Sequence, residues 1–257
     1  MSGHSPLDTD AVEYLYELYH KNLPPLVTEA ALAADSSNSD RSTPASKTYR
    51  RAPTTPLGDS EQSEFLSQLR QRASYSDPTA DRPITDTELA TLLTFAYGEI
   101  GQDSTAPSRR PVPSAGACYP LELYPIVLDS PDIDAGIYHF NADDDSLSQL
   151  QQGDHTEWVQ ENWTWITGDD TVAAAIVITA IPSQNADQYG EMGYLFAGIE
   201  AGAVIQNLQL VAAELGLGSR PHNGLNYSEL RERLRLRNDE YLISTVVFAG
   251  TAPSSAE

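Results

Sequence analysis

The stretch from Tyr189 to Leu215 constrains the fold of this 257-residue chain more than any other part. Its length suits a helix of several turns, and large apolar residues fall on every side of that helix. They are Met192, Phe196, Ile199, Val204, Ile205, Leu208, Val211 and Leu215. A helix with one side in water shows a single apolar stripe, so this one is expected at the centre of a domain or in an interface between subunits. Gly216-Leu217-Gly218 is expected to end it.

The rest of the chain mixes predicted strands and helices without strict alternation, which favours the α+β class. Strands are predicted at Leu121–Leu128, Gly136–Asn141, Ser146–Leu150 and Leu242–Ala249, and the apolar run Val172–Ile181 predicts a central strand buried on both faces. Helices are predicted at Glu61–Ala73, from Thr85 to Gly98, and at Tyr227–Leu236. In the first helix, Ser60 is the expected cap and Phe65, Leu66 and Leu69 are expected to point inward. In the second, Thr85 and Glu88 have the spacing of a capping box.

Composition along the chain predicts three segments. Residues 1–59 combine a helix at Asp8–Asn22 with a connector at Ala30–Thr55 that is rich in Ser, Thr, Asp and Pro. Residues 60–251 form the packed domain, and residues 252–257 form a tail.

The charge balance limits the partners of this chain. Thirty-seven acidic residues face fifteen basic ones, for a net charge of -22. Such a surface repels phosphates, so nucleic acid and anionic membranes are not expected as partners. Only two of the basic residues, Lys21 and Lys47, are lysines. Because about 1 M salt shortens the screening length to about 3 Å, an acidic, lysine-poor surface of this kind favours the hypothesis of a halophilic host.

Several kinds of site are not expected. The five histidines lack metal-ligand spacing, and the single cysteine, Cys118, is interpreted as a buried, inert thiol. No apolar run reaches the ~18–20 residues of a membrane span. The first residues, Met1 to Pro6, lack the features of a signal peptide, so a cytoplasmic protein is expected.

Three segments with the composition of loops stand out as candidate ligand sites. Arg70–Ser74 follows a predicted helix and combines arginine with a serine hydroxyl, which suits a phosphate. Arg109–Pro120 places small residues between prolines, and Gly216–Leu225 places glycines after the long helix, so that backbone N–H groups can face a cleft. The arginine series Arg231–Arg237 is interpreted instead as a solvated, paired face rather than an anion site.

Together these segments resemble flavin-dependent oxidoreductases of the nitroreductase fold, and in particular the SagB-type branch that includes azoline dehydrogenases of peptide maturation. Arg72-Ala73-Ser74 resembles the "RRS" start of the fold. The stretch from Arg110 to Tyr124 is similar to the "R-x-x-PSGGALYPLELY" motif of the branch. Glu200–Leu208 is similar to its "EAGHVAQNL" helix, and the resemblance covers nearly the whole chain.

The resemblance implies a central mixed β-sheet flanked by helices, bound FMN, and an intertwined homodimer with each flavin in the subunit interface. By position, Arg72 and Ser74 are expected to hold the phosphate and ribityl end. The residues expected around the ring are Pro113, Ser114, Ala115, Gly116, Pro221, Asn223 and Gly224, the last two through backbone N–H groups near N5. Because reduction leaves negative charge near N1, Arg110 is the expected cation there.

The chain departs from the azoline dehydrogenases at their base. Those enzymes carry a Lys-Tyr pair before the long helix, where this chain has Gln188-Tyr189. An amide cannot take a proton at neutral pH, so only Tyr189 is kept as a candidate acid or substrate contact. The resemblance therefore favours ping-pong hydride transfer from NAD(P)H through flavin N5 to a small acceptor. Oxidation of an azoline in a peptide and a non-catalytic flavin-binding scaffold remain as alternatives.

Overall fold

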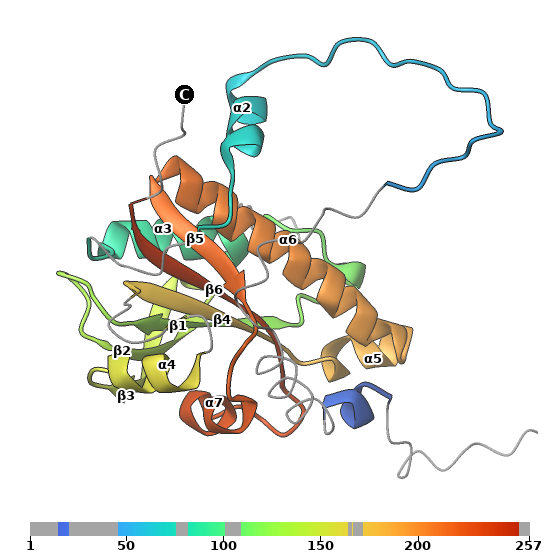
Figure 1. Ribbon diagram of the computed structural model, residues 1–257. Coiled ribbons are helices and arrows are strands. Elements are labelled where there is room, and N and C mark those ends of the chain that lie inside the picture. Colours follow the sequence, from blue (N-terminus) through green and yellow to red (C-terminus); the bar gives the residue numbers. More distant parts are fainter. Residues whose placement is uncertain are drawn as a thin grey trace, which may run out of the picture.

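The chain folds around one six-stranded sheet whose strand order is β3-β2-β1-β4-β6-β5 (Figure 1). The computed structural model describes residues 15–20, 46–75, 82–100, 109–163, 166 and 172–251. The strands are β1 (Leu121–Val127), β2 (Gly136–Asn141), β3 (Ser146–Gln152), β4 (Ala174–Ala180), β5 (Leu217–His222) and β6 (Tyr241–Thr251). The expectations for residues 1–14, for most of the connector and for the tail at 252–257 lie outside the described residues.

Every strand pairing in the described residues is antiparallel, so the expectation of a mixed sheet is wrong for this part of the chain. The predicted central strand is confirmed as β4, which pairs with β1 on one side and β6 on the other. All of its residues are buried. Its continuous apolar sequence suits this place, because both of its faces meet a core.

Helices cover both faces of the sheet, which confirms the α+β class. Figure 1 shows α3 (Asp86–Tyr97) and α6 (Met192–Glu214) on one face, and α4 (Thr156–Asn162) and α7 (Tyr227–Leu234) on the other. The first pair encloses a core that includes Leu92, Val204 and Ile176. The second pair encloses a core that includes Trp158 and Val177. Two further helices are α2 (Glu64–Gln71) and α5 (Ser183–Tyr189).

The long apolar helix is confirmed as α6, although it begins later than expected. Tyr189 is the last residue of α5, and Gly190 separates the two helices with a φ of 54°. Val204 and Leu208 are buried against the sheet, whereas Leu195 and Ile199 are 51% and 62% exposed. Among the described residues, α6 alone has the length and composition of a membrane span, contrary to our expectation of no such run. Its buried side shows that it is a core helix of this domain.

Three local expectations are wrong. The segment expected as the loop Gly216–Leu225 contains strand β5, because the backbone of β6 supplies hydrogen-bonding partners that outweigh its Gly-rich sequence. In α2, Phe65 is 64% exposed and Leu69 is 37% exposed, since the helix stands away from the sheet, and Ser63 rather than Ser60 is the cap. In addition, helix α4 was not predicted, because its seven residues make only about two turns and show little helical periodicity in the sequence.

The predicted capping box of α3 is confirmed: Thr85 Oγ1 accepts from the Glu88 N–H, and the Glu88 carboxylate accepts from the Thr85 N–H. We expect Thr85→Ala to lower the free energy of unfolding by about 1 kcal/mol and Tm by about 2–4 °C. Thermal melts of this variant and of Thr87→Ala, which lies on the exposed side of the same turn, test this. Equal losses in both variants would contradict a specific role for the cap.

The same carboxylate makes part of this stabilisation pH-dependent. Burial raises the pKa of Glu88, but hydrogen bonds from Arg82 and Thr85 outweigh it and hold the pKa below the usual 4.5. The folded-state pKa is thus below the unfolded one, so the contribution is present above the unfolded pKa and is lost as the pH falls through the folded one. We expect Glu88→Gln to lower Tm at pH 7 and to lower it less at pH 3.

Candidate functional site

A cavity of about 460 Å³ lies against the exposed side of α6, and we name it the α6 cavity. The residues that line it come from three elements, from the loop after β5 and from the helical segment 15–20. They are Tyr194, Leu195, Gly198 and Ile199 of α6, Asn223 after β5, Tyr227 of α7, Leu242 and Ile243 of β6, and Tyr19 and His20. Apolar and aromatic walls with a few polar groups are typical of a site for a flat organic ligand.

Two glycines of α6, Gly198 and Gly202, leave space on the helix surface at this cavity. A Cβ atom placed on Gly198 or on Gly202 would meet no atom within 4 Å. These two residues are four apart and share one side of α6. Together they leave a strip of helix surface onto which a flat group can pack against the backbone.

The first predicted segment lies at the other end of β5. The Tyr75 N–H donates to the Ser219 carbonyl at 2.8 Å, which brings the Arg72–Ser74 corner beside the start of the strand. Gln209, a buried residue of α6, donates to Ser74 Oγ at 3.4 Å. Sequence reasoning missed Gln209, because α6 also carries Gln206 and Asn207 and the sequence alone does not show which amide is buried.

Strand β5 then leads from this corner to the α6 cavity. Asn223 lies four positions after Ser219, a distance of about 13 Å along a strand. The Asn223 amide donates to the Ile243 carbonyl at 3.4 Å, and the His222 ring contacts the Gly224 carbonyl at 3.2 Å. The structure thus brings the first and third predicted segments to one surface along α6 and β5, with the Arg72–Ser74 corner at one end and the α6 cavity at the other. We name this surface the groove; the α6 cavity is its hollowed part.

The second predicted segment lies elsewhere. Gly116 has a φ of 64°, and a Cβ there would lie 2.6 Å from Gln188 Oε1 and 3.0 Å from Tyr189 Oη. The structure therefore brings Gly116 together with the candidate residue Tyr189. Ala115–Ala117 forms a 3-10 turn in front of β1, held in part by the Tyr119 N–H, which donates to Ser114 Oγ at 2.9 Å.

This second segment and the α6 cavity lie on different sides of α6. Tyr97 on α3 donates to Glu200 Oε1 at 2.8 Å, which places Glu200 on the side of α6 that faces α3 and the 3-10 turn. Gly198 and Glu200 are two residues apart, a rotation of about 200°. One chain therefore does not bring its Pro113–Gly116 segment to its own groove.

Arg110 is also placed away from the groove. Its guanidinium lies 4.3 Å from the centre of the Tyr97 ring and 5.1 Å from that of Tyr119, and its Nη2 lies 3.5 Å from Asp143 Oδ1. Its expected contact with a flavin stays a prediction, because within a single chain Arg110 does not lie beside the groove. Burial raises the pKa of the neighbouring Glu200, so this carboxyl is less acidic than usual.

Cys118 is partly exposed, so its interpretation as a buried thiol is wrong. The cause is local: Ala117 and Tyr119 on either side adopt positive φ values of 53° and 46°, which turns the chain along the surface before β1. No group of three or more His, Cys, Asp or Glu side chains in the described ranges has the arrangement of a metal site.

The helical segment 15–20 forms a roof over the α6 cavity, which sequence reasoning did not predict. The Tyr16 ring stacks on Tyr194 at 5.4 Å between centroids, and the His20 ring nitrogen lies 2.9 Å from Tyr194 Oη. Burial, together with the charge of Arg231, lowers the pKa of His20 to about 4. His20 is therefore neutral at pH 7, and the roof adds no positive charge to the cavity.

Two proteins of known sequence are similar to this chain. The chain is 28% identical over 193 residues to the Methanocaldococcus jannaschii protein MJ1384, which is named as a nitroreductase; the match covers 74% of this chain and 93% of the relative. It is 31% identical over 137 residues to the microcin B17-processing protein McbC of Escherichia coli, covering 50% of this chain and 49% of McbC.

Two solved structures share the fold. A chain of the Escherichia coli microcin synthetase McbBCD complex with truncated pro-MccB17 bound superimposes with a TM-score of 0.61 at 19% identity, covering 94% of this chain and 98% of the other. A nitroreductase-type protein from Desulfovibrio desulfuricans in complex with FMN superimposes with a TM-score of 0.52 at 16% identity, covering 77% and 93%. The sequence pattern of the nitroreductase family matches residues 69–250, a span that contains all six strands except the last residue of β6. With this match over most of its length, the chain belongs to the nitroreductase family and is an oxidoreductase.

Proposed function

We propose that the groove between α6 and β5 binds FMN and that the chain transfers hydride from NAD(P)H to a small acceptor. The observation that carries this is the surface itself, which has a basic corner at Arg72 and Ser74, an apolar cavity at Asn223 and Gly198, and open helix surface at Gly202 between them. When bound, FMN supplies a site, N5, that accepts and releases hydride. The family assignment supports the same chemistry.

Within this proposal each end of the groove has a distinct task. The Arg72 guanidinium and the Ser74 hydroxyl hold the phosphate, since a dianion needs a charged donor. Asn223, which lines the α6 cavity, and its neighbours Pro221 and Gly224 border the ring edge, where the backbone N–H groups of Asn223 and Gly224 orient the reacting face. The apolar walls from Leu195 and the neighbouring residues exclude water from that face.

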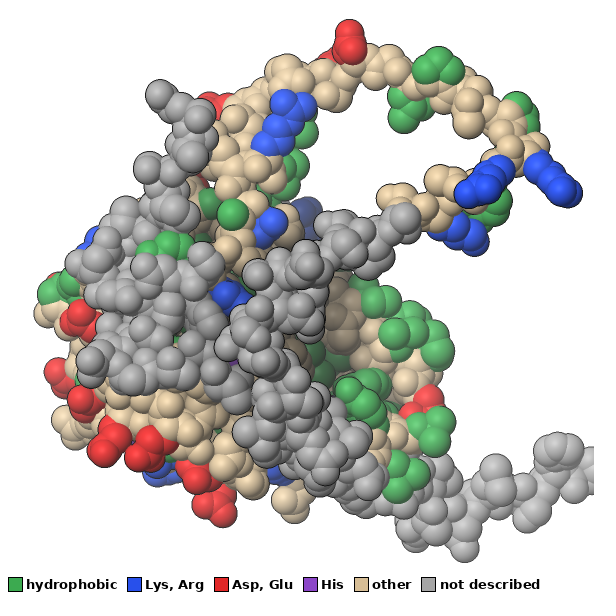
Figure 2. All heavy atoms as spheres, viewed as in Figure 1, with side chains coloured by type: hydrophobic (Ala, Val, Ile, Leu, Met, Phe, Trp, Pro, Cys, Tyr) green, Lys and Arg blue, Asp and Glu red, His purple; other side chains and the backbone are tan. Residues whose placement is uncertain are grey.

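We further propose that two copies of the chain complete each site. The Pro113–Gly116 segment, which does not reach its own groove, is then supplied to the groove of the partner, together with Tyr189. Figure 2 shows hydrophobic side chains gathered on the side of the molecule where α5 and α6 begin. Met192, Leu195, Ile199 and Phe95 are each about half exposed or more, and a dimer interface would bury them.

Reduction by a nicotinamide tests the proposed activity. We expect FMN-loaded protein, kept under nitrogen, to lose its visible flavin absorbance when NADH or NADPH is added, and to regain it when an artificial acceptor follows. A spectrum that stays yellow with both donors would favour the alternative of a flavin-binding scaffold without turnover. Riboflavin 5′-phosphate free in the same buffer is the control for direct reaction.

One observation favours a second candidate, the oxidation of an azoline in a peptide: the alignment with the McbBCD chain covers nearly all of both chains. Against it, the position of the expected base holds Gln188, whose amide lies beside Gly116. We expect the protein to leave a cyclised peptide unchanged in mass, because no basic side chain is available there. Mass spectrometry of the peptide checks this, and the loss of two hydrogens would show that the inference from Gln188 is wrong. Gln188→Lys restores the Lys-Tyr pair and is the matched variant. We expect this variant, and not the parent protein, to oxidise the peptide.

A further inference from the structure

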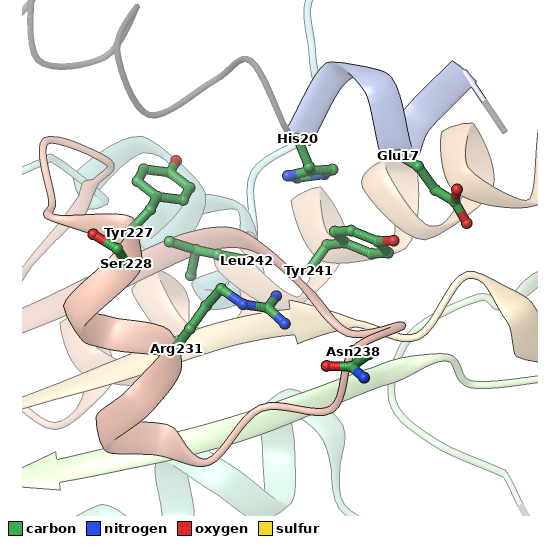
Figure 3. Close-up of a pocket in the computed structure, with 8 residues that line it drawn as sticks. All are labelled: Glu17, His20, Tyr227, Ser228, Arg231, Asn238, Tyr241 and Leu242. Atoms are coloured by element: carbon green, nitrogen blue, oxygen red, sulfur yellow. The ribbon is translucent and has the colours of Figure 1, made fainter. Parts of the chain in front are cut away.

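A second cavity, of about 330 Å³, adjoins the α6 cavity, and we name it the α7 cavity. It lies between the helical segment 15–20, α7 and the start of β6 (Figure 3). The two cavities share three lining residues, His20, Tyr227 and Leu242. A molecule seated in the α6 cavity can therefore extend into the α7 cavity beside the roof.

Arg231 is the one cationic side chain among the described residues that line the α7 cavity. Figure 3 shows its side chain extending from α7 toward Tyr241 and Asn238. Its Nη1 donates to the Glu240 carbonyl at 2.7 Å and its Nη2 to the Arg237 carbonyl at 2.9 Å. These two bonds fix the guanidinium and use two of its five N–H donors. Among the described residues no other partner accepts from it, so three N–H donors are left for a ligand.

This placement corrects the expectation for the arginine series. Arg231 does not lie on a solvated, paired face, because its hydrogen bonds go to backbone carbonyls and no carboxylate pairs with it among the described residues. Arg233, two residues later, lies over the Trp158 ring at 4.5 Å, and Arg237 pairs with Asp239 at 3.1 Å. Of these three arginines, Arg231 alone lines the α7 cavity.

The charges around Arg231 set the valence of the ligand. His20 stacks on the Tyr241 ring at 4.7 Å, and because its pKa is lowered to about 4 it supplies no second positive charge. Glu17, on the helical segment, is the other charged group of the lining and disfavours additional negative charge. One guanidinium, with no second cation among the described residues of the lining, suits a monoanion rather than a dianionic phosphate, and the Asn238 amide offers a further hydrogen bond.

We propose that the α7 cavity binds a carboxylate of the substrate, held by the Arg231 fork, while the reacting part of the same molecule lies in the α6 cavity. This inference rests on the proposed function for the position of the reacting part only. The carboxylate belongs either to a small organic acid or to the end of a peptide, and both present the same planar group to the guanidinium.

Calorimetric titration of the protein with benzoate and with benzamide tests the carboxylate site without turnover. We expect benzoate to bind more tightly than benzamide, and Arg231→Gln to weaken benzoate by about ten- to hundredfold with benzamide unchanged. Arg233→Gln removes the same charge from the same helix outside the cavity and is expected to bind benzoate as the parent does. A short peptide with a free carboxyl end, compared with its amidated form, distinguishes the two sources of the carboxylate.

Two further measurements keep the outcomes distinct. Arg231→Lys retains the charge and is expected to keep most of the preference for benzoate, so it controls for loss of the backbone bonds if Arg231→Gln melts early. Equal binding of benzoate and benzamide, or equal losses in the Gln variants at 231 and 233, would overturn the inference. The α7 cavity is formed by one chain and does not require bound FMN, so the titration is done both with and without FMN. A protein that takes no FMN but prefers benzoate refutes the proposed function alone, whereas a protein that NADH bleaches but that shows no preference refutes this inference alone.

Discussion

Gly198→Leu is expected to melt at or above the temperature of the parent protein and yet to bind FMN at least a hundredfold more weakly. Replacing glycine within a helix stabilises the folded chain by about 1 kcal/mol, and the new Cβ meets no neighbour within 4 Å. The same open space is where we place the flavin, so the leucine side chain fills it. The measurement is a titration with FMN followed by absorbance, beside a thermal melt of the FMN-free protein.

Two variants bracket this result. Gly198→Ala makes the same change in helix propensity with less bulk and is expected to lose less affinity. Ala90→Leu adds a leucine to the exposed side of α3 and is expected to keep full affinity. A stable Gly198→Leu protein that still binds FMN as the parent does would show that the groove is not the flavin site.

Phe95→Glu is expected to convert the proposed dimer into monomers and thereby to abolish FMN binding. Phe95 is 57% exposed on α3 and borders α6, where the Asn207 amide donates to its carbonyl at 3.4 Å. In a single chain a carboxylate at this exposed place is harmless, but burial of an unpaired charge between subunits costs several kcal/mol. Light scattering gives the mass and absorbance gives the bound flavin.

This variant separates the role of the partner from direct contact, because Phe95 lines neither the α6 cavity nor the α7 cavity. Ala90→Glu places the same charge about 140° away around α3, since the two positions are five apart, and is expected to leave the proposed dimer intact. If Phe95→Glu becomes monomeric and retains FMN, one chain suffices for the site. If it remains dimeric, the interface lies elsewhere.

The parts of the fold that the sequence predicts are those decided by short-range patterns. β4 is buried on both faces because every residue from Ala174 to Ala180 is apolar or, at Thr179, hydrogen-bonded, here to Glu240. The capping box at Thr85 depends on residues three apart. Strand β5 was missed because its sequence, Leu217–His222, contains glycine and proline and is held by pairing with β6 across a long sequence separation.

The candidate site shows the same division. The resemblance points to the residues of three segments, but only the topology shows that Ser74 and Asn223 share one groove while Gly116 lies across α6 from it. The roof at 15–20 was not predicted, because the apolar face that Tyr16 presents does not say which surface it covers. Arg231 was assigned to the surface, since its partners are backbone carbonyls that no side-chain pattern reveals.

The central claim is that two copies of this chain together hold FMN. The most direct measurement is the mass and visible spectrum of the purified protein after incubation with riboflavin 5′-phosphate, made in molar KCl because of the net charge of -22. We predict a particle of two chains that carries about one flavin per chain and that NADH bleaches under nitrogen. A colourless single chain that takes up none of the added flavin would contradict the account.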